Sequence, residues 1–201
     1  MAKRSAPEVN AGSMADIAFL LLIFFLVTTT ITTDTGLNRK LPPIDDSEVT
    51  PPIIREKNIF TVLINGRNQL MVEEQLMDLK DLRKAAVEFL DNGGGVDVNG
   101  KACDYCHGKK DPASSDHPDK AIISLKNERE TKYSTYISVQ NELVAAYNEL
   151  RDKRAMELYG LTLKQMEANY ADVNWVGNKE SLKDKIEKVK IEYPQKLSEV
   201  Q

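Results

Sequence analysis

The chain has 201 residues with a formal net charge of −4, and its 41% hydrophobic and 29% charged residues suit one or two small domains with one apolar segment. There is no long basic run, so the composition argues against a nucleic-acid-binding protein. Glycine-rich phosphate loops and the HExxH and GxSxG patterns are missing too. The sequence therefore predicts neither an enzyme nor a protein that holds a cofactor or a metal.

Residues 14–33 form the one apolar segment with the roughly 20 residues that a membrane-spanning helix needs. A short polar tail, residues 1–13, precedes it. A cleaved signal peptide is one alternative, but the threonine-rich end of the segment offers no small-x-small cleavage site. A buried core helix is another, but such a helix usually keeps one polar face. We therefore expect a single N-terminal transmembrane helix, although the flanking basic residues nearly balance and leave its orientation open.

Asp16 places a carboxylate inside this segment, at a cost of about 2.5–3.5 kcal/mol near the bilayer core. Leu20, Ile23 and Val27 share its helical face, so a polar partner must lie on other chains. An apolar setting favours the neutral form, which makes Asp16 a candidate proton carrier. The alternative is a carboxylate at the membrane surface. The threonines at residues 28–33 either line a polar path or bond back to their own helix.

Residues 34–57 form a linker whose two Pro-Pro pairs favour extended backbone. A small α/β domain is expected over residues 58–158, in the order β-β-α-β-α. The strands are expected at residues 59–64, 69–72 and 121–125, and the helices at 78–90 and 133–158. Asn65-Gly66 predicts the hairpin turn between the first two strands. This order places two helices on one face of a sheet.

Two regions depart from this plan. Residues 92–118 form a loop insertion rich in Gly, Asp, Lys and Ser. Residues 159–201 form a helical C-terminal extension, in which Pro194 ends a helix that begins near residue 180. The apolar stripes of the main helices are interpreted as core, with a dimer contact as the alternative. The overall fold class is α+β.

The sequence Cys103-Asp104-Tyr105-Cys106-His107 allows three interpretations. An oxidising compartment favours a Cys103–Cys106 disulfide. CxxCH is also the attachment pattern of c-type haem, with His107 as one axial ligand and His117 as a possible second. Zinc is the third. The polar flanking residues do not suit a haem pocket, so the disulfide is the favoured interpretation.

A family resemblance rests on the motif Asn10-x-x-Ser13-Met14-x-Asp16-Ile17-x-Phe19-x-Leu21-Leu22-Ile23-Phe24-Phe25. It resembles the membrane helix of the ExbD/TolR family, and the layout matches over residues 8–155. The resemblance implies that Asp16 carries protons and that the N-terminus is cytoplasmic. It also implies a folded domain in the periplasm and a homodimer whose helices lie inside an ExbB-type pentamer. The partner receiving the energy is then a TonB-type transducer that serves outer-membrane nutrient receptors.

The linker departs from the family pattern at one position. Leu37, Leu41 and Pro42 fit it, but Arg39 replaces an apolar residue. The insertion and the extension suggest a Bacteroidota-type member most like ExbD. One alternative is a TolR-like subunit of an envelope system. Another is a membrane-tethered periplasmic redox or haem domain that uses the CxxCH motif.

Overall fold

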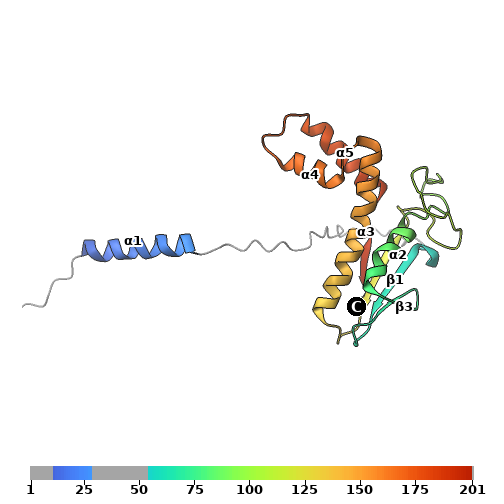
Figure 1. The fold of residues 1–201 in the computed structure, drawn as a ribbon, viewed down its shortest axis with the longest axis horizontal. Helices are drawn as coiled ribbons and strands as arrows, with labels where there is room; N and C mark the ends of the chain where they lie inside the picture. The colour runs from blue at the N-terminus through green and yellow to red at the C-terminus, as the bar shows by residue number, and fades with distance from the viewer. Residues whose placement is uncertain (1–10, 29–53, 201) are drawn as a thin grey trace, which may run out of the picture. The chain divides into compact units, whose positions relative to one another are not determined.

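The structure is a computed structural model that describes residues 11–28 and 54–200. The chain divides into two compact units, Met1–Thr50 and Pro51–Gln201. Among the residues described, the first contains one helix and the second a mixed α/β fold (Figure 1). The expected α+β class is therefore confirmed.

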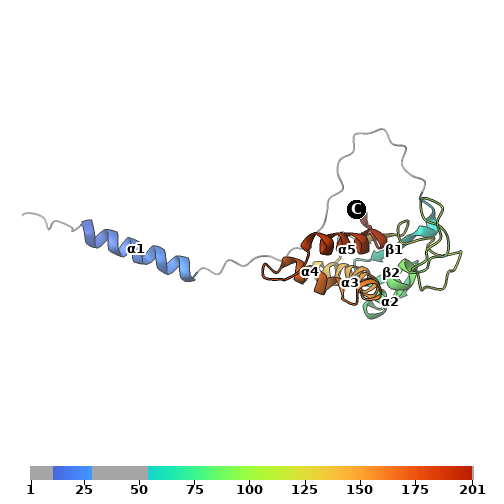
Figure 2. The same cartoon turned by 90° about the horizontal axis from the view of Figure 1, so that it is seen from above.

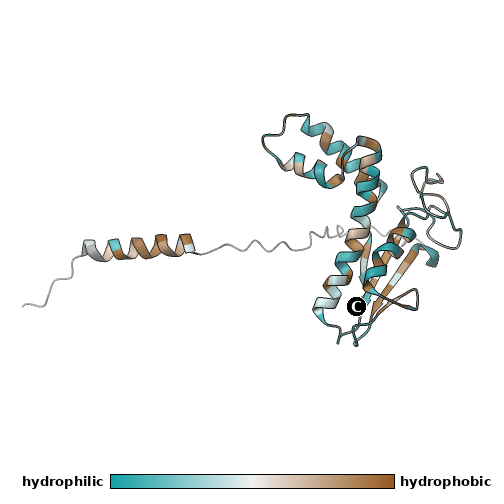
Figure 3. Ribbon diagram, viewed as in Figure 1, coloured by the Kyte–Doolittle hydropathy of each residue, from teal (hydrophilic) through white to brown (hydrophobic). Residues whose placement is uncertain are grey.

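Helix α1 (Ala11–Thr28) begins within the expected polar tail and runs through the apolar segment. Apolar residues dominate it beyond its first turns (Figure 3). Residues 29–33, the end of the expected membrane segment, lie outside the described residues, as do linker residues 34–53. Across the described ranges, no helix combines the length and apolarity needed to cross a membrane.

The second unit is built on a five-stranded sheet with the order β3-β2-β1-β4-β5. Its strands are β1 (Ile59–Ile64), β2 (Leu70–Val72), β3 (Gln75–Met77), β4 (Ile122–Asn127) and β5 (Leu197–Val200). The β1–β2–β3 part is antiparallel, whereas β1 pairs with β4 and β4 with β5 in parallel. A short 3-10 turn, η1 (Glu56–Asn58), precedes β1, so the last residues of the expected linker belong to the folded unit.

Helices α2 (Leu79–Leu90) and α3 (Tyr133–Tyr159) pack together on the sheet. Phe60, Val62 and Ile64 alternate with more exposed residues along β1 and face these helices, because strand side chains point to opposite faces in turn. Burying this apolar face is the main drive for folding. The expected packing of two helices on a sheet is confirmed.

A second, smaller core lies at the far end of α3. There α3 packs with α4 (Leu163–Ala171) and α5 (Lys179–Glu192). Gly160 ends α3 in the left-handed conformation, with φ of 69°, as expected for a residue just past a helix. Thr162 and Gln165 form a capping box that starts α4. The helical pair lies above the sheet in the view of Figure 1, toward the end of α3.

The hairpin expected at Asn65-Gly66 is present, because β1 and β2 pair antiparallel across residues 65–69. The β1–β2 turn places Asn68, with φ of 63°, in the left-handed region, and not Gly66. The Asn65 side chain accepts hydrogen bonds from the backbone N–H groups of Arg67 and Gln69, which fix the turn over residues 65–69. Glu73 and Glu74 both have positive φ in the turn between β2 and β3. Glycine and asparagine are the residues that usually predict such a turn, and neither is present there.

The expected boundary at residue 159 does not separate the extension from the fold. Strand β5, which the sequence did not reveal, pairs with β4 and forms one edge of the sheet. Tyr193 is part of the main core. Helix α5 matches the expected helix closely, but the chain after it returns to the sheet. The C-terminal extension is therefore a structural part of the α/β unit.

Candidate functional site

Asp16 lies in the second turn of α1 and is the only charged residue of that helix. Its side chain is exposed in this unit, and no hydrogen bond or ion pair of its carboxylate is found among the described residues. Leu20, Ile23 and Val27 follow on the same helical face. The helix supplies no group that would neutralise the carboxylate, so any partner must come from outside it.

Thr28, at the end of α1, donates its hydroxyl to the carbonyl of Phe24 at 2.7 Å. A threonine bonded to its own helix in this way does not offer that proton to a polar path. Of the two interpretations of the threonines, Thr28 therefore follows the self-bonded one. The remaining threonines lie beyond the described part of α1.

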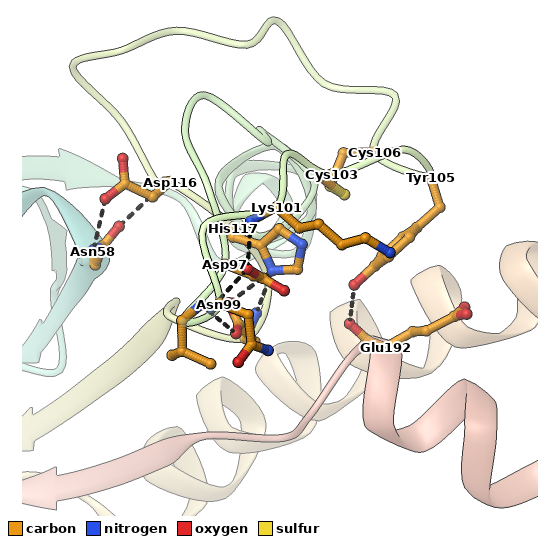
Figure 4. A network of polar contacts seen from close by, with 12 residues as sticks. Asn58, Asp97, Asn99, Lys101, Cys103, Tyr105, Cys106, Asp116, His117 and Glu192 are labelled. Atoms are coloured by element: carbon orange, nitrogen blue, oxygen red, sulfur yellow. Dashed lines mark hydrogen bonds and ion pairs between the residues drawn. A yellow bond between two sulfur atoms is a disulfide. The ribbon is translucent and has the colours of Figure 1, made fainter.

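In the α/β unit, the insertion is fastened where the chain enters the sheet (Figure 4). The amide of Asn58 donates to the Asp116 carboxylate at 3.2 Å and accepts from the Asp116 backbone N–H at 2.8 Å. Lys57 forms an ion pair with the same carboxylate at 2.5 Å. We call Lys57, Asn58 and Asp116 the entry clasp. Sequence reasoning missed it because the clasp joins residues 58 positions apart.

The charge state of Asp116 follows from these contacts. Burial opposes ionisation, but the hydrogen bonds from Lys57 and Asn58, together with the charges of Lys57 and Arg55, outweigh it and lower the pKa of the carboxyl. Asp116 is therefore an anion at neutral pH that holds the insertion against the start of β1.

Asn92 organises the interior of the insertion in a similar way. Its amide nitrogen donates to the carbonyls of Asp111 and Ser115, at 2.8 and 2.7 Å, and its amide oxygen accepts from the Asp111 backbone N–H at 2.9 Å. The Asn92 side chain thus satisfies backbone hydrogen-bonding groups in a loop that contains little secondary structure. Residues 92–118 form an ordered loop fixed by polar side chains.

Cys103 and Cys106 are paired as a disulfide within this loop, and both are buried. Gly93, with φ of 61°, lies so close that a side chain there would overlap Cys106. Each sulfur is bonded to the other, so in this arrangement neither can form the thioether that a c-type haem requires. The described residues contain no group of three or more His, Cys, Asp or Glu placed to hold a metal ion.

The two histidines of the insertion are directed to different carboxylates. His107 is exposed and lies 3.6 Å from Glu157 of α3. His117 is buried and lies 2.7 Å from Asp119 through Nδ1. Tyr105, between the cysteines, packs edge-on against the His117 ring and donates its hydroxyl to the carbonyl of Glu192 at 2.8 Å. The CxxCH motif thus ties the insertion to the end of α5.

The entry clasp gives a first prediction. Asp116→Asn should lower the free energy of unfolding at pH 7 by about 1–2 kcal/mol, because Lys57 loses its charged partner. The folded-state pKa of Asp116 is lowered, so its stabilising effect is present above the ordinary Asp value of about 4 and is lost as pH falls through the folded-state value. Urea unfolding at several pH values should show a shallower acid decline in the variant. Asp104→Asn, at an exposed position of the same loop, is the control, and an equal effect there would contradict the clasp.

The cysteine pair gives a second prediction. Cys103→Ser/Cys106→Ser should lower the free energy of unfolding by about 2 kcal/mol, as expected for a bridge that closes a very short loop. A reductant should destabilise the wild-type chain by a similar amount and leave the variant unchanged. Alkylation of both thiols in the native, unreduced protein, detected by mass spectrometry, would show that the bridge is absent.

Comparison with known proteins places these features in a family. No curated protein matches the chain significantly. The sequence model described as "Biopolymer transport protein ExbD/TolR" matches residues 2–151, which include all of α1 and most of the α/β unit. The chain therefore belongs to the ExbD/TolR family, whose proteins are membrane-anchored and are not enzymes.

Proposed function

We propose that the chain is the accessory subunit of an inner-membrane, proton-driven motor of the ExbB–ExbD kind. In this proposal residues 14–33 span the membrane once, the N-terminus is cytoplasmic, and the α/β unit lies in the periplasm. The observation that carries the proposal is the lone carboxylate of Asp16 on an otherwise uncharged helix, within the segment that the family model matches.

A lone membrane anchor would gain nothing from the carboxylate of Asp16. A carboxylate near the bilayer core costs about 2.5–3.5 kcal/mol, and a single helix recovers none of it. The cost is acceptable where neighbouring helices or water receive the side chain. A helix pair from two copies of the chain, enclosed by an ExbB-like pentamer, provides such a setting.

The mechanism follows from the two charge states of one side chain. Protonated Asp16 is neutral and loses its attraction to polar groups of the surrounding subunits, whereas ionised Asp16 regains it. Alternation between these states lets a proton gradient bias the position of the helix pair. The linker then passes the displacement to the periplasmic unit and on to a TonB-type transducer that drives import across the outer membrane.

The fold supports this route because the linker leads toward the central strand of the sheet. Strand β1 lies at the centre of the sheet, paired on both sides with β2 and β4. The entry clasp fixes the residues immediately before β1 to the insertion. A pull arriving through the linker is thus carried by the sheet as a whole.

The central test is Asp16→Asn, which removes the titrating group and keeps its size. The variant should insert, assemble with the pentamer and fold normally, yet lose proton-dependent uptake of outer-membrane substrates. Asp16→Glu, which still titrates, should keep part of the activity. Uptake at the wild-type level in Asp16→Asn, with normal assembly, would contradict the proton-carrying role.

The partner that co-purifies distinguishes the two machines of the family. A TonB-type protein supports the proposal. A TolA-type protein would assign the chain to the TolR-like alternative, in which the same Asp16 chemistry serves the cell envelope.

A further inference from the structure

The loop between α4 and α5, residues 172–178, presents apolar side chains to solvent. Val173 is 87% exposed and Val176 is 97% exposed, although valine is usually buried. Tyr170, in the last turn of α4, is partly exposed beside them. The loop caps the helical pair at the end away from the sheet (Figures 1 and 2). We call residues 170–177 the apolar tip.

The apolar tip is an ordered structure. The Asp172 side chain accepts a hydrogen bond from the Asn174 backbone N–H at 2.9 Å, and Lys179 donates to the Asp172 carbonyl at 2.7 Å. Trp175 turns inward and packs against the second core. Gly177 lies directly against the indole, where any side chain would overlap the ring. The indole therefore anchors the loop, and the two valines are held outward by it.

The charges near the apolar tip do not indicate a charged binding partner. Asp172 and Glu180 are matched in number by Lys179 and Lys183 in the loop and the first turns of α5. The exposed Tyr170 lies three residues before Val173, and tyrosine is enriched where proteins meet the membrane interface. A contact made here would be driven by apolar burial and would depend little on salt.

We propose that the apolar tip inserts into the surface of the lipid bilayer that holds α1. This inference rests on the proposed function, because it requires the chain to be membrane-anchored. A small convex tip buries little area, but tethering compensates for this. The residues between the described parts, 29–53, could span at most about 90 Å. These residues tether the tip to the membrane. Short flexible tethers of this kind raise the effective concentration of the tethered group to about the millimolar range.

A bilayer suits the tip better than a protein partner does. A protein must offer a matching apolar hollow, whereas lipid adapts to any small apolar protrusion. The charges of both signs around the tip balance in number, so they form no one-sign patch for a charged protein partner. Contact with the bilayer would fix the periplasmic unit at a defined distance from the motor.

The chain has a single tryptophan, so Trp175 reports on the tip alone. The full chain is reconstituted in phosphatidylcholine vesicles, with and without lipids brominated along the acyl chains. The wild-type protein should lose Trp175 emission in brominated vesicles and shift its emission to shorter wavelength. Val173→Ser/Val176→Ser should reduce the ratio of docked to free tip at least about tenfold. Val98→Ser, at a 72% exposed valine in the insertion, is the matched control and should behave as wild type.

The other possible outcomes distinguish a failure of this inference from a failure of the proposed function. A chain that floats with the vesicles but shows no bromine quenching overturns the inference and leaves the proposed function intact. A chain that does not float at all contradicts the membrane anchor itself. Quenching that requires anionic lipid and disappears at high salt would assign the contact to lysines and overturn the apolar tip. Loss of uptake in the valine variant without quenching in the wild type would mean that a protein covers the tip, which also overturns the inference.

Discussion

The buried side chain of Tyr193 joins parts of the chain that are far apart in sequence. Its hydroxyl donates to Asp91, at the end of α2, at 2.8 Å, and its carbonyl accepts from the Arg151 guanidinium of α3 at 2.8 Å. Its ring packs edge-on against Tyr105 of the insertion. Burial, and then the Asp91 carboxylate, raise the pKa of Tyr193, so its phenol remains a donor. Two helices, the insertion and the start of β5 thus depend on one residue.

This junction explains why β5 can be so short. An isolated four-residue strand at a sheet edge gains little from pairing alone. Here the chain is already fixed by Tyr193, and the Tyr147 hydroxyl of α3 bonds to the backbone of Lys196 just before the strand. With its start held in place, β5 needs only to continue along β4. The parallel edge of the sheet is therefore supported from the helical layer.

The elements predicted from the sequence include the short strands β2 and β4 and the helix α5, and the prediction was closest where the periodic pattern is long. β1, α2 and α3 combine apolar side chains at strand or helix spacing with clear end signals, and their bounds lay within about two residues of expectation. β3 was missed because Glu73-Glu74 gives no turn signal, although both residues adopt the left-handed conformation. The entry clasp was missed because a single Asp and a single Asn in loops look like solvated residues until the fold places them together. The local sequence pattern therefore predicts where helices and strands form. The polar pairs that fix the loops join residues far apart in sequence, and a local pattern does not reveal them.

Asp16 differs from the polar groups of the entry clasp and the Tyr193 junction in whether it has a partner within the chain. In the α/β unit each buried polar group of the entry clasp and the Tyr193 junction meets a partner from the same chain. On α1 the carboxylate meets none among the described residues. Among the described residues, the Ser115 hydroxyl is the buried side-chain group that lacks a hydrogen-bond partner. An unpaired charge costs more than an unpaired hydroxyl where water is excluded, so in a membrane the Asp16 carboxylate would need partners from other chains. The proposed function therefore assigns different roles to the two parts of the chain: the α/β unit pairs its buried polar groups internally, and neighbouring subunits supply the partners of Asp16. In that proposal, a change of charge at Asp16 moves the helix without requiring a change in the α/β fold.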